Sequence, residues 1–380
     1  MGFGGYMLAK AIYTRISLRK RADNKREVTK KHVGEVLELL KEFKLSPALE
    51  EELPRADVTR IHELLKKGEV TCVDLIKFFT KLSGKRCLEL NAIVDFLYDE
   101  AIGMAKEKDQ QLKALISSGK ELPLLFGIPI SLKDVLNYKN HDTSMGSAAF
   151  TFDPCDEHGL IVLQLLEAGG IPFVKTNCPQ LLLINETNNF IWGRAKNPWD
   201  LERSTGGSSG GEGAIVATGC SPIGIGSDGG GSVRIPATYC GIFGIRPTAR
   251  RYTLLGHKPP SSYTPRHIFG CIGPMTKTAS DSIRVMEALQ NYKILNRFDP
   301  LLPTVEWKRE VVEEYSQKRL RIGVMRRFDV SSVINARSWE FSRDSKILWM
   351  RRLLHLESRV MKSSTTNSTR NLRRSFYFPS

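Results

Sequence analysis

Hydrophobic residues recur at three- and four-residue spacing over two early stretches of the chain. The stretches VGEVLELLKEFKLSPALEEELP (33–54) and ADVTRIHELLKKGEVTCVDLIKFFTKL (56–82) combine leucines and valines at this spacing with charged residues between them. An α-helix brings such positions onto one face, so the pattern predicts amphipathic helices that pack on a core.

Further along, short apolar runs alternate with helical patterns. AIVDFLYDEAIGMAKEKDQQLKALISSGK (92–120) begins like a strand and continues as a polar-faced helix. HGLIVLQLLEAGGIPFVKTN (158–177) predicts a helix, a glycine turn and a strand. Strands that alternate with helices predict an α/β fold with a layered sheet, mostly of parallel type, that places functional turns at strand ends.

Glycine and serine are concentrated between residues 204 and 232, which read STGGSSGGEGAIVATGCSPIGIGSDGGGS. Two glycine-rich turns, one with Ser208 and one with Ser232, flank the stretch AIVATGCSPIGIG, which is too apolar for a flexible linker. Glycine permits positive φ and lets main-chain N–H groups come close to a ligand. The two turns therefore suit a loop that stabilises an anion.

A lysine precedes these turns. Lys133 ends the strand-like run FGIPISLKD (126–134), where burial would favour the neutral amine and make it a candidate general base. It precedes Ser208 by 75 positions, and Ser208 precedes Ser232 by 24.

This order and spacing of one lysine and two serines resembles the amidase signature family, and most closely its fatty-acid amide hydrolase branch. The resemblance runs from about Ile61 to about Phe328. It implies an α/β fold in which a mixed β-sheet core is sandwiched between helices. Four segments carry it: FGIPISLKDVLNYKNHDTSMGS (126–147), VKTNCPQ (174–180), FIWGRAKNPWD (190–200) and SVRIPATYCGIFGIRPT (232–248).

Carried over residue by residue, the resemblance makes Ser232 the nucleophile that forms an acyl-enzyme. Ser208, preceded by a cis peptide bond in that family, would be the bridging serine. Lys133 would be the neutral general base, taking a proton from Ser208 as Ser208 takes one from Ser232. The resemblance thus implies hydrolysis of fatty-acid amides without a metal or another cofactor.

The residues around the nucleophile have candidate supporting roles, and the resemblance implies the oxyanion hole among them. Asp228 and Arg234 flank Ser232 and form a candidate ion pair that holds the loop, together with Ser209, although two solvated charges are the alternative. The oxyanion hole would consist of consecutive main-chain N–H groups, those of Gly229, Gly230, Gly231 and Ser232.

Other catalytic motifs do not fit the sequence. GIGSDGGGS (224–232) has the glycine spacing of a dinucleotide loop, but no acidic residue follows about 20 positions later in a strand-loop-helix unit. Ser232 lies outside a G-x-S-x-G elbow. Seven scattered histidines without an H-x-x-x-H motif argue against a metal site, and seven cysteines without a C-x-x-C pair predict reduced thiols.

The formal net charge of +15 belongs mainly to the two ends of the chain. Residues 1–32 hold nine basic and two acidic side chains, and residues 330–380 hold ten and three, so the body between them is nearly neutral. Binding of nucleic acid would require basic residues on the folded body, and we therefore do not expect it.

The N-terminal stretch MGFGGYMLAKAIYTRISLRKRADNK joins a short apolar patch to a basic cluster. Lys10 and Arg15 interrupt the patch, so it does not span a bilayer. An interfacial helix on an anionic membrane and a frayed, solvated terminus both fit this pattern. Without a signal-peptide pattern, the expected location is cytoplasmic or peripheral on the cytoplasmic face of a membrane.

Together, these patterns divide the chain into a basic N-terminal segment (1–35), an amidase-signature domain (36–328) and a basic tail (329–380) that does not resemble the family. Since family members are longer, we expect the C-terminal third of the domain to be missing and the tail to be disordered. The expected partners are a fatty-acid amide, a membrane surface and a second copy in a homodimer. Two alternatives stay open: a truncated, weakly active or inactive homologue, and an amidase of small polar amides.

Overall fold

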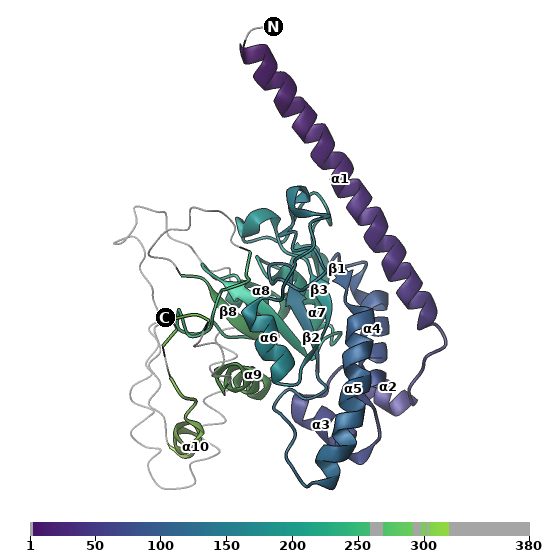
Figure 1. Cartoon of the computed structure of the whole chain (residues 1–380), viewed down its shortest axis with the longest axis vertical. Coiled ribbons are helices and arrows are strands. Elements are labelled where there is room, and N and C mark those ends of the chain that lie inside the picture. Colours follow the sequence, from purple (N-terminus) through teal and green to yellow (C-terminus); the bar gives the residue numbers. More distant parts are fainter. Residues whose placement is uncertain (1–2, 259–268, 292–297, 301, 304, 319–380) are drawn as a thin grey trace, which may run out of the picture. The chain divides into compact units, whose positions relative to one another are not determined.

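The structure is a computed structural model that describes residues 3–258, 269–291, 298–300, 302–303 and 305–318 (Figure 1). The chain divides into two units, Met1–Lys308 and Arg309–Ser380, and the described helix of the second is α10 (Arg309–Gln317). The tail expected over 329–380 lies outside the described residues. The elements that position the candidate site all belong to the first unit.

Local signals begin and end the early helices of this unit. Gly68 ends α3 (Val58–Lys67) in the left-handed conformation at φ 69°, which favours glycine. Thr71 and Asp74 form a capping box at the start of α4 (Cys72–Cys87), each side chain accepting a hydrogen bond from the other residue's N–H. The predicted amphipathic helices therefore begin and end at residues that the sequence marks.

The N-terminal segment forms one long helix, α1 (Phe3–Leu39), which passes without a break through the boundary expected at residue 35. A second, short helix, α2 (Pro47–Glu52), follows it, and proline at its first position suits a helix start. The helix expected over 33–54 is thus split in two.

Basic residues in the middle of α1 attach it to the body of the unit. Lys25 forms an ion pair with Asp142 at 2.8 Å, and the Arg26 guanidinium donates to the carbonyl oxygen of Ile191 at 2.7 Å. Part of the positive charge near the N-terminus therefore serves packing within the fold.

The first unit contains a six-stranded sheet, in the order β1-β3-β2-β6-β8-β7. β2 runs parallel to β3 and to β6, whereas the pairs β1-β3, β6-β8 and β7-β8 are antiparallel. The strands are β1 (Ile93–Phe96), β2 (Pro129–Lys133), β3 (Ile171–Thr176), β6 (Ile223–Asp228), β7 (Phe243–Gly244) and β8 (Cys271–Thr276).

This topology confirms the expected mixed sheet between helices, but the expectation that it is mostly parallel was wrong. Helical crossovers produce the parallel pairs: α6 connects β2 to β3, and α7 precedes β6. A pattern of alternating strands and helices predicts the elements but does not contain the direction of the outer strands, which pairing with distant segments decides.

Helices cover both faces of the sheet, and α6 and α9 contact each other (Figure 1). A two-stranded ribbon, β4-β5, leads into α7. The remaining elements of this unit are α5 (Tyr98–Ser117), η1 (Ala148–Phe150), α6 (Leu160–Glu167), η2 (Gln180–Leu182), β4 (Lys196–Asn197), β5 (Asp200–Ser204), α7 (Gly210–Ala217), α8 (Arg234–Cys240) and α9 (Ala279–Asn291).

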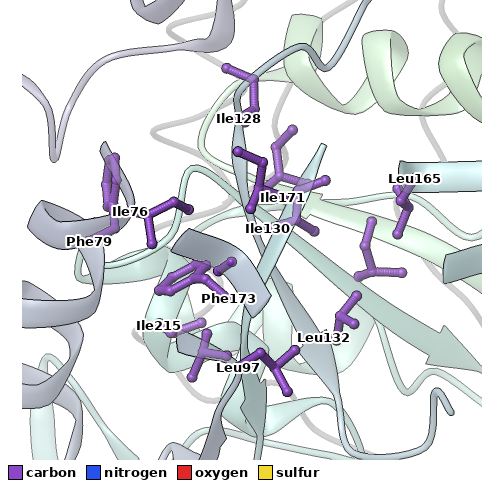
Figure 2. Close-up of a cluster of buried hydrophobic side chains, with 14 of the residues drawn as sticks. Ile76, Phe79, Leu97, Ile128, Ile130, Leu132, Leu165, Ile171, Phe173 and Ile215 are labelled. Carbon is purple, nitrogen blue, oxygen red and sulfur yellow. The ribbon is translucent and has the colours of Figure 1, made fainter. Parts of the chain in front are cut away.

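The hydrophobic core forms around β2 and β3 (Figure 2). Ile130 and Leu132 of β2 belong to this core and are fully buried. Because side chains alternate along a strand, Ser131 and Lys133 point to the opposite face, where they are fully buried as well. One strand thus supplies both core packing and polar groups inside the protein.

Candidate active site

Lys133 lies at the end of β2, with its side chain fully buried. Its Nζ donates a hydrogen bond to Oγ of Ser208 at 2.6 Å. Burial lowers the pKa of Lys133 to about 8, although Cys178, Asp228 and Glu212 act in the opposite direction. A large share of the amine is therefore neutral slightly above neutral pH.

Ser208 lies in the glycine-rich turn between β5 and α7, and it too is buried. The peptide bond between Gly207 and Ser208 is cis. A Cβ at position 207 would lie 2.9 Å from the backbone of Asn185 and of Glu186, so this close approach requires glycine. The turn thereby brings the Ser208 hydroxyl up to Lys133.

Ser232 lies in the second glycine-rich turn, between β6 and α8, and is partly exposed. The N–H of Ser209 donates to the carbonyl oxygen of Ser232 at 3.1 Å, which holds the two turns together. The Ser232 hydroxyl has no hydrogen-bond partner among the described residues. The structure therefore joins Lys133 to Ser208 through side chains, and it joins the Ser208 turn to the Ser232 turn through the backbone.

The consecutive N–H groups expected in the oxyanion hole differ in their availability. The N–H of Gly231 donates to Oδ1 of Asp228 at 2.7 Å, whereas those of Gly229, Gly230 and Ser232 have no partner within the described ranges. Gly229 and Gly230 are exposed. Three of the four N–H groups thus have no acceptor among the residues that the structure describes, and the fourth holds the loop.

Asp228 organises this second turn. Its buried carboxylate accepts two hydrogen bonds from the Arg234 guanidinium, both at 3.0 Å, and a further one from the N–H of Val233 at 3.1 Å. Burial raises the pKa of Asp228, but the bonds from Arg234, Val233 and Gly231 outweigh it and lower the pKa overall. The carboxylate therefore stays charged at neutral pH.

Three polar residues near the candidate site were not predicted from the sequence. Ser227 accepts a hydrogen bond from Lys133 Nζ at 2.9 Å, and Arg246 lies 3.5 Å from Asp228. Glu212 is fully buried on α7. A serine in the apolar strand IGIGSD and a single acid in the apolar helix GGEGAIVA were available signals, but nothing marked Arg246 as a partner 18 positions away.

A profile of the family described as Amidase matches residues 76–348. The match extends beyond Phe328, where the resemblance in the sequence was expected to end.

Two curated relatives show how much of the chain is shared. The Vitamin D3 hydroxylase-associated protein of Gallus gallus is 35% identical over 266 residues, which cover 70% of this chain and 54% of the relative. The Fatty acid amide hydrolase 1 of Caenorhabditis elegans is 36% identical over 270 residues, which cover 70% of this chain and 46% of the relative. The chain spans about half the length of these curated relatives.

The fold agrees with this relationship. A solved structure named Fatty acid amide hydrolase matches with a TM-score of 0.67 at 29% identity, covering 76% of this chain and 53% of that one. Since the family profile covers most of the chain and both sequence and fold agree, the chain belongs to the amidase signature family.

Proposed function

We propose that this chain carries the catalytic site of an amide hydrolase in which Ser232 attacks the amide carbonyl. The observation that supports this most directly is the buried 2.6 Å hydrogen bond between Lys133 and Ser208. A lysine whose pKa burial lowers to about 8 can accept a proton near neutral pH. Ser208, whose Oγ is hydrogen-bonded to this amine, can pass a proton from Ser232 to Lys133.

The proposed reaction begins with a neutral Lys133. Ser208 transfers its proton to Lys133 Nζ and takes the proton of Ser232, while Ser232 Oγ bonds to the carbonyl carbon. When the tetrahedral intermediate collapses, the C–N bond breaks and the amine leaves with the proton returned through Ser208. Water then attacks the acyl-enzyme with the same proton relay, which releases the acid and restores Ser232.

The negative charge on the carbonyl oxygen needs donors that the protein does not already use. The N–H groups of Gly229, Gly230 and Ser232 fit this role, because no acceptor of the described residues occupies them. Gly231 would instead keep the loop in place through Asp228. One such donor typically contributes about 3 kcal/mol to transition-state stabilisation.

For the substrate, we propose long-chain fatty-acid amides. Support comes from the relative and the solved structure that are named as fatty-acid amide hydrolases. The second candidate is hydrolysis of small polar amides. Because the chain spans about half the length of such relatives, a truncated, weakly active or inactive homologue is the third.

The decisive experiment treats the purified chain with a fluorophosphonate probe and maps the adduct by mass spectrometry. We expect a single adduct on Ser232. Hydrolysis of a series of primary amides with increasing acyl length should then accelerate with chain length, since each buried CH₂ contributes about 0.8 kcal/mol. Faster hydrolysis of short polar amides would favour the second candidate, and absence of any adduct would contradict catalysis by this chain.

We also propose that the N-terminal part of α1 contacts an anionic membrane surface. Ile12, Tyr13 and Ile16 are exposed on this helix, close to Arg15 and Arg19. Apolar residues beside cations suit an interfacial helix. Among the described residues, no helix is both long and apolar enough to cross a membrane. The homodimer stays a prediction.

Replacing Ile12, Tyr13 and Ile16 together by serine should weaken binding of the full chain to anionic vesicles by about tenfold or more, because it removes the apolar side chains that would enter the lipid. Co-sedimentation with phosphatidylserine vesicles measures this. The matched control replaces the exposed Leu183 by serine and should bind like the unmodified chain. Equal binding by the triple variant would contradict the membrane contact.

A further inference from the structure

Glu212 is a buried carboxyl group that the proposed reaction does not use. It lies in the first turn of α7, four residues after Ser208, and its side chain is fully buried. A buried carboxyl group is costly unless its oxygens accept hydrogen bonds, so its partners indicate what it does.

One partner of Glu212 lies on the strand that carries Lys133, and the other lies on the strand paired with it. Oε2 accepts a hydrogen bond from Ser131 Oγ at 2.5 Å, and Oε1 accepts one from Thr176 Oγ1 at 2.7 Å. Ser131 precedes Lys133 by two positions on the same face of β2. Thr176 is the residue of β3 paired with Lys133 in the sheet. The carboxyl group thus connects the helix that follows Ser208 to the strand that carries Lys133 and to the neighbouring strand β3.

The neighbouring strand leaves space for this carboxyl group. A Cβ at Gly224 of β6 would lie within van der Waals overlap of Glu212 Oε2. Glycine at that position is therefore required for the carboxyl group to enter between the helix and the sheet, independently of the hydrogen bonds.

The charge of Glu212 is balanced differently from that of Asp228. Arg234 and Arg246 both lie against Asp228 and offset its charge. Glu212 accepts its described hydrogen bonds from neutral hydroxyl groups, and Lys133 is the cation whose charge acts on it. Burial raises the pKa of Glu212 to about 7, while Ser131, Thr176 and Lys133 lower it.

We propose that Glu212 is a positioning residue for Lys133: it ties the Ser208 turn to the strand end that carries the lysine, and its negative charge makes Lys133 a stronger base. The effect of Glu212 on the position and basicity of Lys133 is argued from the contacts and charge of Glu212. The consequence of this effect for catalysis rests on the function proposed above.

Other titratable groups near Glu212 and Lys133 lie on separate elements. Cys178 and Asp228 raise the pKa of Lys133, and burial together with the charge of Lys133 lowers the pKa of His257. The thiol of Cys240 packs against α7 at Gly213, and burial raises its pKa to about 12, so it stays neutral. Replacing Glu212 alone removes one charge and leaves these groups in place.

The test measures the titration of Lys133 directly. The full chain is prepared with ¹³C at the ε-carbon of lysine, and the Lys133 signal is assigned by its absence from Lys133→Met. We expect the midpoint of Lys133 to fall by about one pH unit in Glu212→Gln, which keeps the side-chain shape but removes the charge. The same change should move the pH dependence of fluorophosphonate labelling in the same direction.

Two further variants make the result interpretable. Asp281→Asn removes another buried carboxyl group, which accepts from the N–H of Val58 and from Thr278, and should leave the Lys133 midpoint unchanged. Thr176→Val removes one hydrogen-bond donor to Glu212 and should lower the Lys133 midpoint by a smaller amount. If Glu212→Gln does not fold, this variant tests the proposal in its place.

An unchanged midpoint in Glu212→Gln, or an equal shift in Asp281→Asn, would overturn the proposal. A shifted Lys133 midpoint in a chain that no fluorophosphonate labels would instead contradict the proposed hydrolase activity, and it would leave the link between Glu212 and Lys133 intact.

Discussion

Replacement of Ser232 by alanine is expected to abolish labelling by a fluorophosphonate and to lower amide hydrolysis by a factor on the order of 10⁴ to 10⁶. The change removes the attacking oxygen, while Lys133 and Ser208 keep their hydrogen bond. Because the Ser232 hydroxyl has no partner among the described residues, we expect the free energy of unfolding to change by less than about 0.5 kcal/mol. Labelling rates and urea unfolding measure the two effects.

The matched control is Ser118→Ala. Ser118 is exposed at the end of α5, where its hydroxyl donates to the carbonyl oxygen of Leu115. This variant should be labelled at the rate of the unmodified chain. Persistent labelling of Ser232→Ala at another residue would show that the nucleophile had been assigned wrongly.

Replacement of Lys133 by methionine is expected to lower the labelling rate of Ser232 by about 10²- to 10⁴-fold, the usual contribution of a general base. In the unmodified chain, labelling should rise with pH as Lys133 loses its proton, with a midpoint near the pKa of about 8. The variant lacks the titrating amine, so its rate should not show this midpoint. Labelling measured from pH about 6 to about 10 separates the two curves.

Methionine keeps most of the length of the unbranched lysine side chain, which limits the cavity that the substitution leaves. The control is Lys113→Met, since Lys113 is exposed on α5. It should retain both the labelling rate and the midpoint. If Lys133→Met kept the midpoint near pH 8, another group would have to be the base, and the proposed proton relay would be wrong.

The local elements of this fold could be predicted because their signals lie within a few residues. The capping pair Thr71 and Asp74 marks the start of α4, and Gly68 marks the end of α3. The direction of β1 and β8 could not be predicted, since it depends on pairing with β3 and β6, which are distant in the chain.

The residues of the candidate site also divide into those that local sequence patterns predicted and those whose role depends on distant parts of the chain. Lys133 and the serine-bearing turns stood out in the sequence because glycine clusters and a lysine at a strand end are local patterns. Arg246 did not, because its approach to Asp228 depends on how the segment after α8 returns to β6. Glu212 and Ser227 had weak local signals whose meaning depends on their position beside Lys133.

By itself, the sequence determined which chemical groups this protein has and on which elements they lie: a lysine at a strand end, and two serines in glycine turns. Only the tertiary structure decided their distances and their charge states. Residues 75 positions apart meet at 2.6 Å because α7 packs on the face of β2 that carries Lys133. That packing also removes water from the amine, and loss of water, rather than any property of the lysine in the free chain, brings its pKa to about 8.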